Sequence, residues 1–192
     1  MTYFIIGLLI FLGTHSIRIV ADDWRSLQVA RFGLLPWKLL YGAISALGFG
    51  LIVWGFSTAR PDSSILWNPP LWTRHAAALL TLPAFIFIVA AYIPRNRIRT
   101  SLGHPMVLGV MIWALAHLLA NGRSIDLLLF GSFSAWAAVD YAMAVQRDRK
   151  ANTRYPVSTL MNTLITVVIG LVGWWLFAGY LHVKLIGIQP FG

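Results

Sequence analysis

Residues 105–145 have the sequence PMVLGVMIWALAHLLANGRSIDLLLFGSFSAWAAVDYAMAV, and this stretch decides the fold. It contains two apolar runs, 105–120 and 124–145, with a short polar connection between them. Each run approaches the ~20 residues that cross ~30 Å of hydrocarbon as a helix. Asn121 and Gly122 favour the end of a helix, and the polar residues after them favour the start of another. The stretch therefore predicts a tight antiparallel pair of membrane helices.

Further apolar runs of similar length lie on both sides of this pair. Hydrophobic residues make up 58% of the 192-residue chain, and charged residues make up 11%. An ordinary soluble domain has roughly 25% charged residues, so the lipid bilayer must replace most of a soluble core here. We predict an all-α, polytopic integral membrane helical bundle of about six transmembrane helices. The expected spans are 2–20, 36–58, 71–93, 105–120, 124–145 and 156–183.

The positive charges are distributed unevenly over the connections between these spans. Eleven of the fifteen Lys and Arg residues flank or fill the first, third and fifth connections. Basic residues accumulate on the cytoplasmic side of membrane proteins, which predicts that both termini point to the outer side of the membrane. The net charge of +9 is divided among short gaps, so we expect no nucleic-acid binding. The chain is expected to pass through its membrane several times.

Small and polar residues at helical spacing predict the faces on which the helices pack. Helices in lipid approach closely where side chains are small, and hydroxyl or amide groups bond across such contacts. The expected packing faces are Gly42, Ala46 and Gly50 in the second span, Gly131, Ala135, Ala138 and Ala142 in the fifth, and Thr159, Asn162, Thr163, Thr166, Gly170 and Gly173 in the sixth.

Few side chains within the spans can carry acid–base chemistry or bind metal. The chain has no Cys and no Glu, which excludes disulfides, thiolate metal sites and di-iron carboxylate sites. Asp140 is the one Asp expected well inside a span, where an ion pair or a functional role is the general expectation. The catalytic residues, if there are any, stay unknown.

Histidines are the most suggestive residues for a cofactor. His15, His75, His104 and His117 lie within or at the ends of the expected spans. Neutral imidazoles in a small apolar bundle suit axial ligation of haem, while hydrogen-bonded packing and ligation of another metal are the alternatives. His104 and His117 are ~20 Å apart along one helix and on nearly opposite faces, so they cannot share one iron.

Four short strings occur in the order in which they occur in the NnrU family of bacterial membrane proteins, and the chain resembles that family. The family is associated with denitrification gene clusters and with nitrite and nitric oxide reduction, and the resemblance implies the bacterial inner (cytoplasmic) membrane as the location, with several passes and both termini periplasmic. The family is similar to the plant zeta-carotene isomerase, a haem b enzyme of plastid membranes. The strings are FLGTHSIR at 11–18, PPLWTRH at 69–75, GHPM at 103–106 and WALAHLLANG at 113–122.

The resemblance extends to about Arg149 and implies two parts of the chain. The first is an NnrU-like five-helix membrane domain at 1–149. The second is a basic linker with a sixth transmembrane helix at 150–192. Ala114 stands where the plant pattern has a cysteine three residues before the second histidine, so a redox switch of haem ligands through that thiol is absent here.

The resemblance implies haem b as the cofactor, with His15 and His117 as the metal ligands. The helix positions favour His75 as an alternative partner of His117, since both are expected in one leaflet. His15 is expected ~15 Å from His117 along the bundle axis. Arg18 and Arg74 are the expected partners of the haem propionates, with anchoring at the membrane interface as the alternative.

Three classes of function remain from the sequence. The first is a haem b-binding membrane protein that acts in nitrite or nitric oxide respiration or as a zeta-carotene-isomerase-like enzyme. The second is a non-catalytic accessory or assembly factor for another membrane enzyme complex, such as a denitrification enzyme. The third is a small transporter, which is disfavoured because the sequence lacks the repeated halves with broken helices typical of that class.

Overall fold

The structure is a computed structural model, and it describes residues 1–191. The all-α class is confirmed. Four helical segments, the last of them formed by α9, a π-helix and α10 together, are long and apolar enough to cross a membrane, and α1 and α7 are shorter apolar helices. The elements are α1 Thr2–His15, α2 Ile17–Val20, α3 Asp22–Phe32, α4 Leu34–Ala59, α5 Trp72–Tyr92, α6 Arg97–Leu102, α7 Pro105–Ala120, α8 Ser124–Lys150, α9 Leu160–Leu176, the π-helix η1 Phe177–Leu181 and α10 His182–Ile186.

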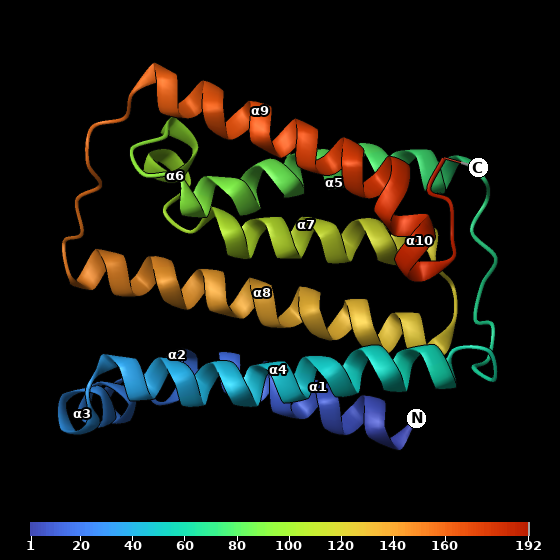
Figure 1. Ribbon diagram of the computed structural model, residues 1–192, viewed down its shortest axis with the longest axis horizontal. Helices are drawn as coiled ribbons and strands as arrows, with labels where there is room; N and C mark the ends of the chain where they lie inside the picture. Colours follow the sequence, from blue (N-terminus) through green and yellow to red (C-terminus); the bar gives the residue numbers. More distant parts are fainter. Residues whose placement is uncertain (192) are drawn as a thin grey trace.

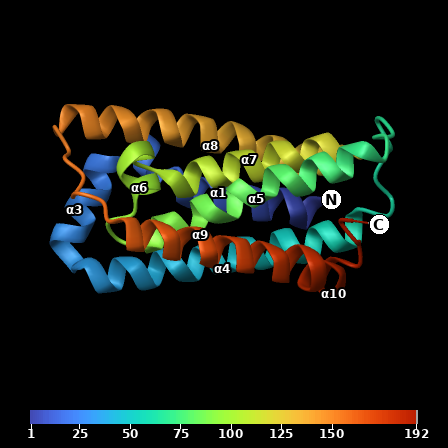
Figure 2. The ribbon, with the colours of Figure 1, turned by 90° about the horizontal axis from the view of Figure 1, so that it is seen from above.

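The helices form two groups that lie along one common axis (Figure 1). In the first group α1 packs along α4; in the second, α7 packs against α5 and α8, and α9 packs on α5. The groups meet where α1 and α2 contact α8. Both termini lie at one end of the bundle, which we call the terminal end, while α3 and α6 lie at the opposite end, which we call the α3 end (Figures 1 and 2).

The first helix is shorter than the span expected from the sequence. It ends at His15, whereas the span was expected to continue to Val20. Thr14, His15 and Ser16 each bond through their side chains to the carbonyl group four residues earlier, at 2.6 to 2.7 Å. Such bonds compete with the backbone ladder and favour a bend or an end of the helix. The chain then turns into α3, a helix that the sequence analysis did not predict.

The contact between α1 and α4 depends on glycines that bring the two backbones together. A Cβ atom at Gly7 would lie 2.6 Å from the backbone nitrogen of Ile52. A Cβ atom at Gly48 would lie 2.8 Å from the backbone nitrogen of Phe11, and one at Gly55 would overlap the backbone of Phe4. Close approach of this kind is the packing mode that small residues permit in lipid.

The small-residue stripes predicted for α4 and α8 were wrong. Gly42, Ala46 and Gly50 are all exposed, and a Cβ atom at Gly42 or Gly50 would meet nothing within 4 Å. The packed face of α4 contains Gly48 and Ile52, which lie two positions after Ala46 and Gly50. Each position turns a helix by about 100°, so a shift of two positions leads to the opposite face of the helix. The predicted stripe on α8 fails in the same way, because Ala135, Ala138 and Ala142 are exposed and Gly131 is half-buried.

The polar face predicted for the last span is confirmed. Thr166 is fully buried, and a Cβ atom at Gly170 would lie 2.7 Å from the Cα atom of Ile86 on α5. Asn162 donates to the carbonyl of Pro94 at 2.9 Å. The Asn162 amide and the close approach at Gly170 therefore hold α9 against α5 and the connection that follows it, while the Thr166 hydroxyl donates to the Asn162 carbonyl of its own helix.

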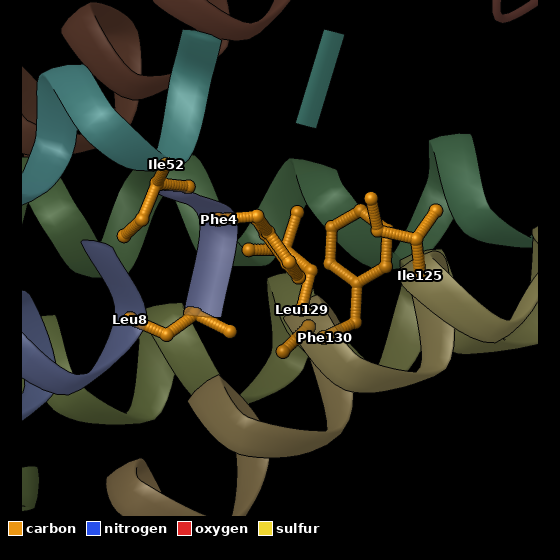
Figure 3. Packing of buried hydrophobic residues seen from close by; sticks show 7 residues of the cluster. Phe4, Leu8, Ile52, Ile125, Leu129 and Phe130 are labelled. Carbon is orange, nitrogen blue, oxygen red and sulfur yellow. The ribbon is translucent and has the colours of Figure 1, made fainter. Parts of the chain in front are cut away.

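The main core cluster lies toward the terminal end and joins the two groups of helices. It combines residues of α1, α4, α7 and α8, and six of them are labelled in Figure 3. Many other large apolar side chains are exposed, as is typical of a bundle whose outer surface faces lipid. The members of the cluster are Phe4, Leu8, Ile52, Ala114, Ile125, Leu129 and Phe130.

Candidate haem ligands and the cavity at the α3 end

His15 lies at the end of α1 among aromatic side chains from three helices. Its ring stacks on Phe11 with centroids 4.2 Å apart, and it meets Tyr41 and Trp136 edge-on at 5.3 and 5.9 Å. The Nδ1 atom lies 2.7 Å from the carbonyl oxygen of Phe11. A carbonyl oxygen can only accept, so Nδ1 donates and Nε2 is left unprotonated in the neutral ring. This is the arrangement of a histidine that ligates metal through Nε2.

His117 has the same backbone bond on another helix. Its Nδ1 atom lies 2.8 Å from the carbonyl oxygen of Trp113, and the carbonyl of His117 accepts from Asn121 at 2.9 Å. The ring lies 5.0 Å from Trp113 and 4.7 Å from Phe130. His117 therefore also presents an unprotonated Nε2 within an aromatic surround.

A continuous series of ring contacts connects the two histidines. Phe133 of α8 contacts both Phe11 and Trp113, each with centroids 5.7 Å apart. His15 follows Phe11 by four residues, and His117 follows Trp113 by four residues. Because α1 and α7 run in opposite directions, the two histidines lie on opposite sides of the level of Phe133. At 1.5 Å per residue the two are offset by ~12 Å along the bundle, close to the ~15 Å expected from the sequence. The structure thus connects the two predicted ligands through aromatic rings and does not place them in contact.

The other predicted cofactor residues lie apart from this aromatic series. His75 and Arg74 are exposed in the first turn of α5. Among residues 1–191, no ring contact joins His75 to His117. Arg18, one turn after His15, is exposed and forms an ion pair with Asp22 at 3.3 Å. The structure therefore does not gather the five predicted cofactor residues into one cluster, and their roles stay predictions.

A histidine that the sequence analysis left outside the site lies at the same end of the bundle as His117. This is His182, in the first turn of α10 (Figure 1). Its Nδ1 atom donates to the carbonyl of Ile188 at 2.7 Å, so its Nε2 atom is also unprotonated in the neutral ring. The position of His182 relative to His117 could not be predicted from the sequence, because it depends on how the last turns of the chain fold back.

His104, at the opposite end of α7, forms a hydrogen bond with an acid of α8. Its Nε2 atom lies 2.9 Å from Oδ2 of Asp148, and the Tyr155 hydroxyl donates to the same oxygen at 2.5 Å. Burial together with the neighbouring Asp148 carboxylate raises the pKa of Tyr155 to about 12. This network attaches the connection between α8 and α9 to the start of α7.

A large cavity opens at the α3 end between the two groups of helices. Its volume is about 1050 Å³, and both His15 and His104 line it, whereas His117 does not. Asp140 lies in its wall and forms an ion pair with Arg147 at 3.8 Å, which confirms the ion pair expected for this residue. Six basic residues line the cavity, namely Arg18, Arg25, Lys38, Arg99, Arg147 and Lys150.

The terminal end holds a buried ion pair that the sequence analysis missed. Asp126 is 1% exposed, and its oxygens lie 3.1 and 3.4 Å from the Arg60 guanidinium. Arg123 donates from Nη1 to three carbonyl oxygens, those of residues 60, 61 and 63. The loop is also tied to the turn before α8, because the amides of Leu66 and Trp67 donate to the Gly122 carbonyl. The sequence analysis assigned the polar residues after Gly122 only to the start of a helix. The pair between Asp126 and Arg60, which are 66 residues apart, was therefore not anticipated.

Comparison with known proteins gives one family and no closer relative. The family described as NnrU protein matches residues 3–190. The match continues past Arg149 through the last helices, which the four strings did not reach. No curated protein and no solved structure matches the chain. Within residues 1–191, no three His or Asp side chains converge as a site for a metal ion.

Proposed function

Since the chain belongs to the NnrU family, we propose that it is a haem b-binding membrane protein with His15 and His117 as the axial ligands. The observation that carries the proposal is that each of the two imidazoles makes the same kind of hydrogen bond to its own helix backbone. Each donates from Nδ1 to the carbonyl four residues earlier, which fixes the ring and leaves Nε2 for iron. The family is linked to denitrification gene expression, so we assign the protein to nitrite or nitric oxide respiration. Isomerase-like activity is the second assignment within the same class.

The donor chemistry around the two imidazoles suits haem. Phe11, Phe133 and Trp113 provide the apolar aromatic surround that a macrocycle requires. One haem can reach both Nε2 atoms only after these rings change rotamer, because they lie along the path between the histidines. Bound between two imidazoles, haem would supply one-electron transfer, since both axial positions of the iron are then taken.

The propionates of such a haem need cationic partners. Arg18 lies one turn from His15 and can exchange its exposed pair with Asp22 for a propionate, because an exposed pair of this kind is weak. Arg74 directly precedes His75 in the chain and is the corresponding partner if His75 is the ligand. The two arginines thus belong to alternative pairs and not to one site.

The first test compares two histidines of α7. His117→Ala should abolish six-coordinate haem in the purified protein, because the ligand is removed. His104→Ala should retain it, because His104 bonds to Asp148 at the other end of the helix. The measurement is the absorption spectrum of both variants at matched yield. Equal haem content in the two variants would contradict the role of His117.

The second test identifies the partner of His117. His15→Ala, His75→Ala and His182→Ala are compared in the same way, and only the variant at the true ligand should give a five-coordinate or haem-free protein. We expect that variant to be His15→Ala. A normal spectrum for His15→Ala together with a changed spectrum for either of the others would replace His15 in the pair.

A non-catalytic accessory role in a denitrification enzyme complex is the second candidate. It is favoured by the ring contacts of Phe133 with Phe11 and Trp113, which place aromatic side chains between the two histidines. Co-purification with the respiratory enzyme, combined with a haem-free wild-type protein, would support this role over the haem protein.

We extend the proposal to topology: all six apolar segments cross the inner membrane, and both termini are periplasmic. The support is that both termini lie at one end of the bundle, while eleven of the fifteen basic residues belong to connections at the other (Figure 1). A C-terminal reporter that works only in the periplasm should be active. Activity of a reporter that works only in the cytoplasm would contradict this topology.

A further inference from the structure

The cavity at the α3 end changes from charged to aromatic along its length. On α8 its lining runs from Lys150 at the end of the helix to Trp136, ~21 Å deeper along the axis. On α4 it runs from Trp37 and Lys38 to Tyr41, one turn further into the bundle. The cavity therefore combines cations near its mouth with aromatic rings in its interior.

The cations of the cavity exceed the acids that could pair with them. Three acids line it, and each already has a partner: Asp22 pairs with Arg18, Asp140 with Arg147 and Asp148 with His104. Within residues 1–191 these are the only ion pairs formed by cavity residues, so other cations are left without an acid. These cations are Arg25, Lys38, Arg99 and Lys150.

The mouth of the cavity lies where a membrane surface is expected. Trp37 lines the cavity and also meets Trp24 of α3 edge-on at 5.8 Å. Leu27 and Phe32 of α3 are exposed as well, at 67% and 58%. Tryptophans and amphipathic helices gather at the level of lipid headgroups. A ligand in this cavity can therefore reach the headgroup layer and the apolar interior together.

We propose that this cavity binds a membrane amphiphile with a single anionic headgroup, a carboxylate or a phosphate. The headgroup contacts Arg25 and Lys38, and the apolar chain lies against Trp37, Tyr41 and Trp136. The excess of cations accounts for the charge of the headgroup, and the aromatic interior accounts for the chain. The inference goes beyond haem binding and does not rest on it, because the headgroup contacts Arg25 and Lys38, which have no proposed role toward haem, although His15 and Arg18 line the same cavity.

The test uses the full-length protein in phosphatidylcholine nanodiscs and measures retained amphiphiles by native mass spectrometry. One arm adds a minor fraction of phosphatidylglycerol as a bilayer source, and the other adds oleate as a free acid. The double variant Arg25→Gln, Lys38→Gln is compared with Arg31→Gln, Arg97→Gln. The control loses the same charge at the same end from residues that do not line the cavity.

We expect wild type to retain an anionic amphiphile in preference to phosphatidylcholine, and the cavity variant to retain about tenfold less. The control should stay within about twofold of wild type. Retention of phosphatidylglycerol would identify a bilayer lipid as the source, and retention of oleate alone would identify a free acid. No preference for the anions, or equal losses in both double variants, would overturn the proposal. Loss of haem from the cavity variant with unchanged retention of amphiphile would also overturn it, because the cations would then serve the porphyrin carboxylates.

Discussion

The two ends of the bundle both carry charged residues but use them differently. At the terminal end Asp126 is buried against Arg60, and Arg123 is bonded to three carbonyls. At the α3 end the cavity contains cations that no acid of the described chain neutralises. The difference indicates that charges at the terminal end stabilise the fold. At the α3 end three acids are paired as well, but Arg25, Lys38 and Lys150 have no acid among the described residues and line the cavity, where a ligand can reach them.

The largest expected effect concerns the terminal end. Arg60→Ala leaves the Asp126 carboxylate, which is 1% exposed, without its cation, and breaking a buried pair so that a charge stays buried and unpaired costs about 3–5 kcal/mol. We expect a marked fall in the melting temperature of the detergent-purified protein. Asp62→Ala, in the same loop region but exposed, serves as the control and should behave as wild type. Equal melting temperatures for both variants would contradict the claim that charges at the terminal end stabilise the fold.

A smaller effect is expected where α1 and α4 touch. Gly55→Ala places a methyl group into the backbone of Phe4, and overpacking of this kind costs about 1–3 kcal/mol. Gly50→Ala is the matched control on the same helix, because its methyl group meets nothing within 4 Å. Thermal unfolding should show a loss for the first variant and none for the second. A loss confined to Gly50→Ala would restore the stripe that the sequence predicted.

The Tyr155 network at the α3 end is expected to contribute less. Tyr155→Phe removes one hydrogen bond to Asp148, which is worth about 1 kcal/mol. The raised pKa keeps the phenol protonated in the folded state, so this contribution holds up to about pH 10, the ordinary pKa, and declines as the pH rises toward about 12. Melting of Tyr155→Phe and of the exposed control Tyr92→Phe should therefore differ at pH 8. Identical curves would show that this bond does not hold the connection.

The smallest expected effect is that of Asp140→Asn. The pair with Arg147 is long, at 3.8 Å, so its loss should cost no more than about 1 kcal/mol. Haem content should not change, because Asp140 is not among the predicted ligands. Asp23→Asn on exposed α3 is the control for the charge change. Loss of haem from Asp140→Asn at normal yield would place this carboxylate in the cofactor site.

The helices could be predicted from the sequence because apolar runs of bilayer length are a strong signal. The start of α7 at Pro105 and the turn at Asn121 and Gly122 agree with the expectation from residues 105–145. The packing faces of α4 and α8 could not be predicted, because small residues occur on more than one face and only the neighbouring helix selects one. The polar face of α9 was predicted correctly, since polar side chains of a membrane helix turn toward the bundle; the buried Thr166 hydroxyl itself bonds within α9, to the Asn162 carbonyl.

The candidate site was predicted only in its parts. The family strings selected His15 and His117, but the rings that connect them come from helices whose relative rotation the sequence does not encode locally. The pair between Arg60 and Asp126 spans two loops and was missed for the same reason. The cavity was missed because its cations belong to several connections, each of which alone resembles an ordinary cytoplasmic loop.

The most direct test of the haem proposal is the absorption spectrum of wild-type protein expressed with ample haem and purified in detergent. The account predicts a Soret band and sharp α and β bands on reduction, with about one haem per chain, as two imidazole ligands require. Protein of normal yield that shows no Soret absorbance would contradict the proposal. His15 and His117 would then be packing residues of an accessory membrane protein.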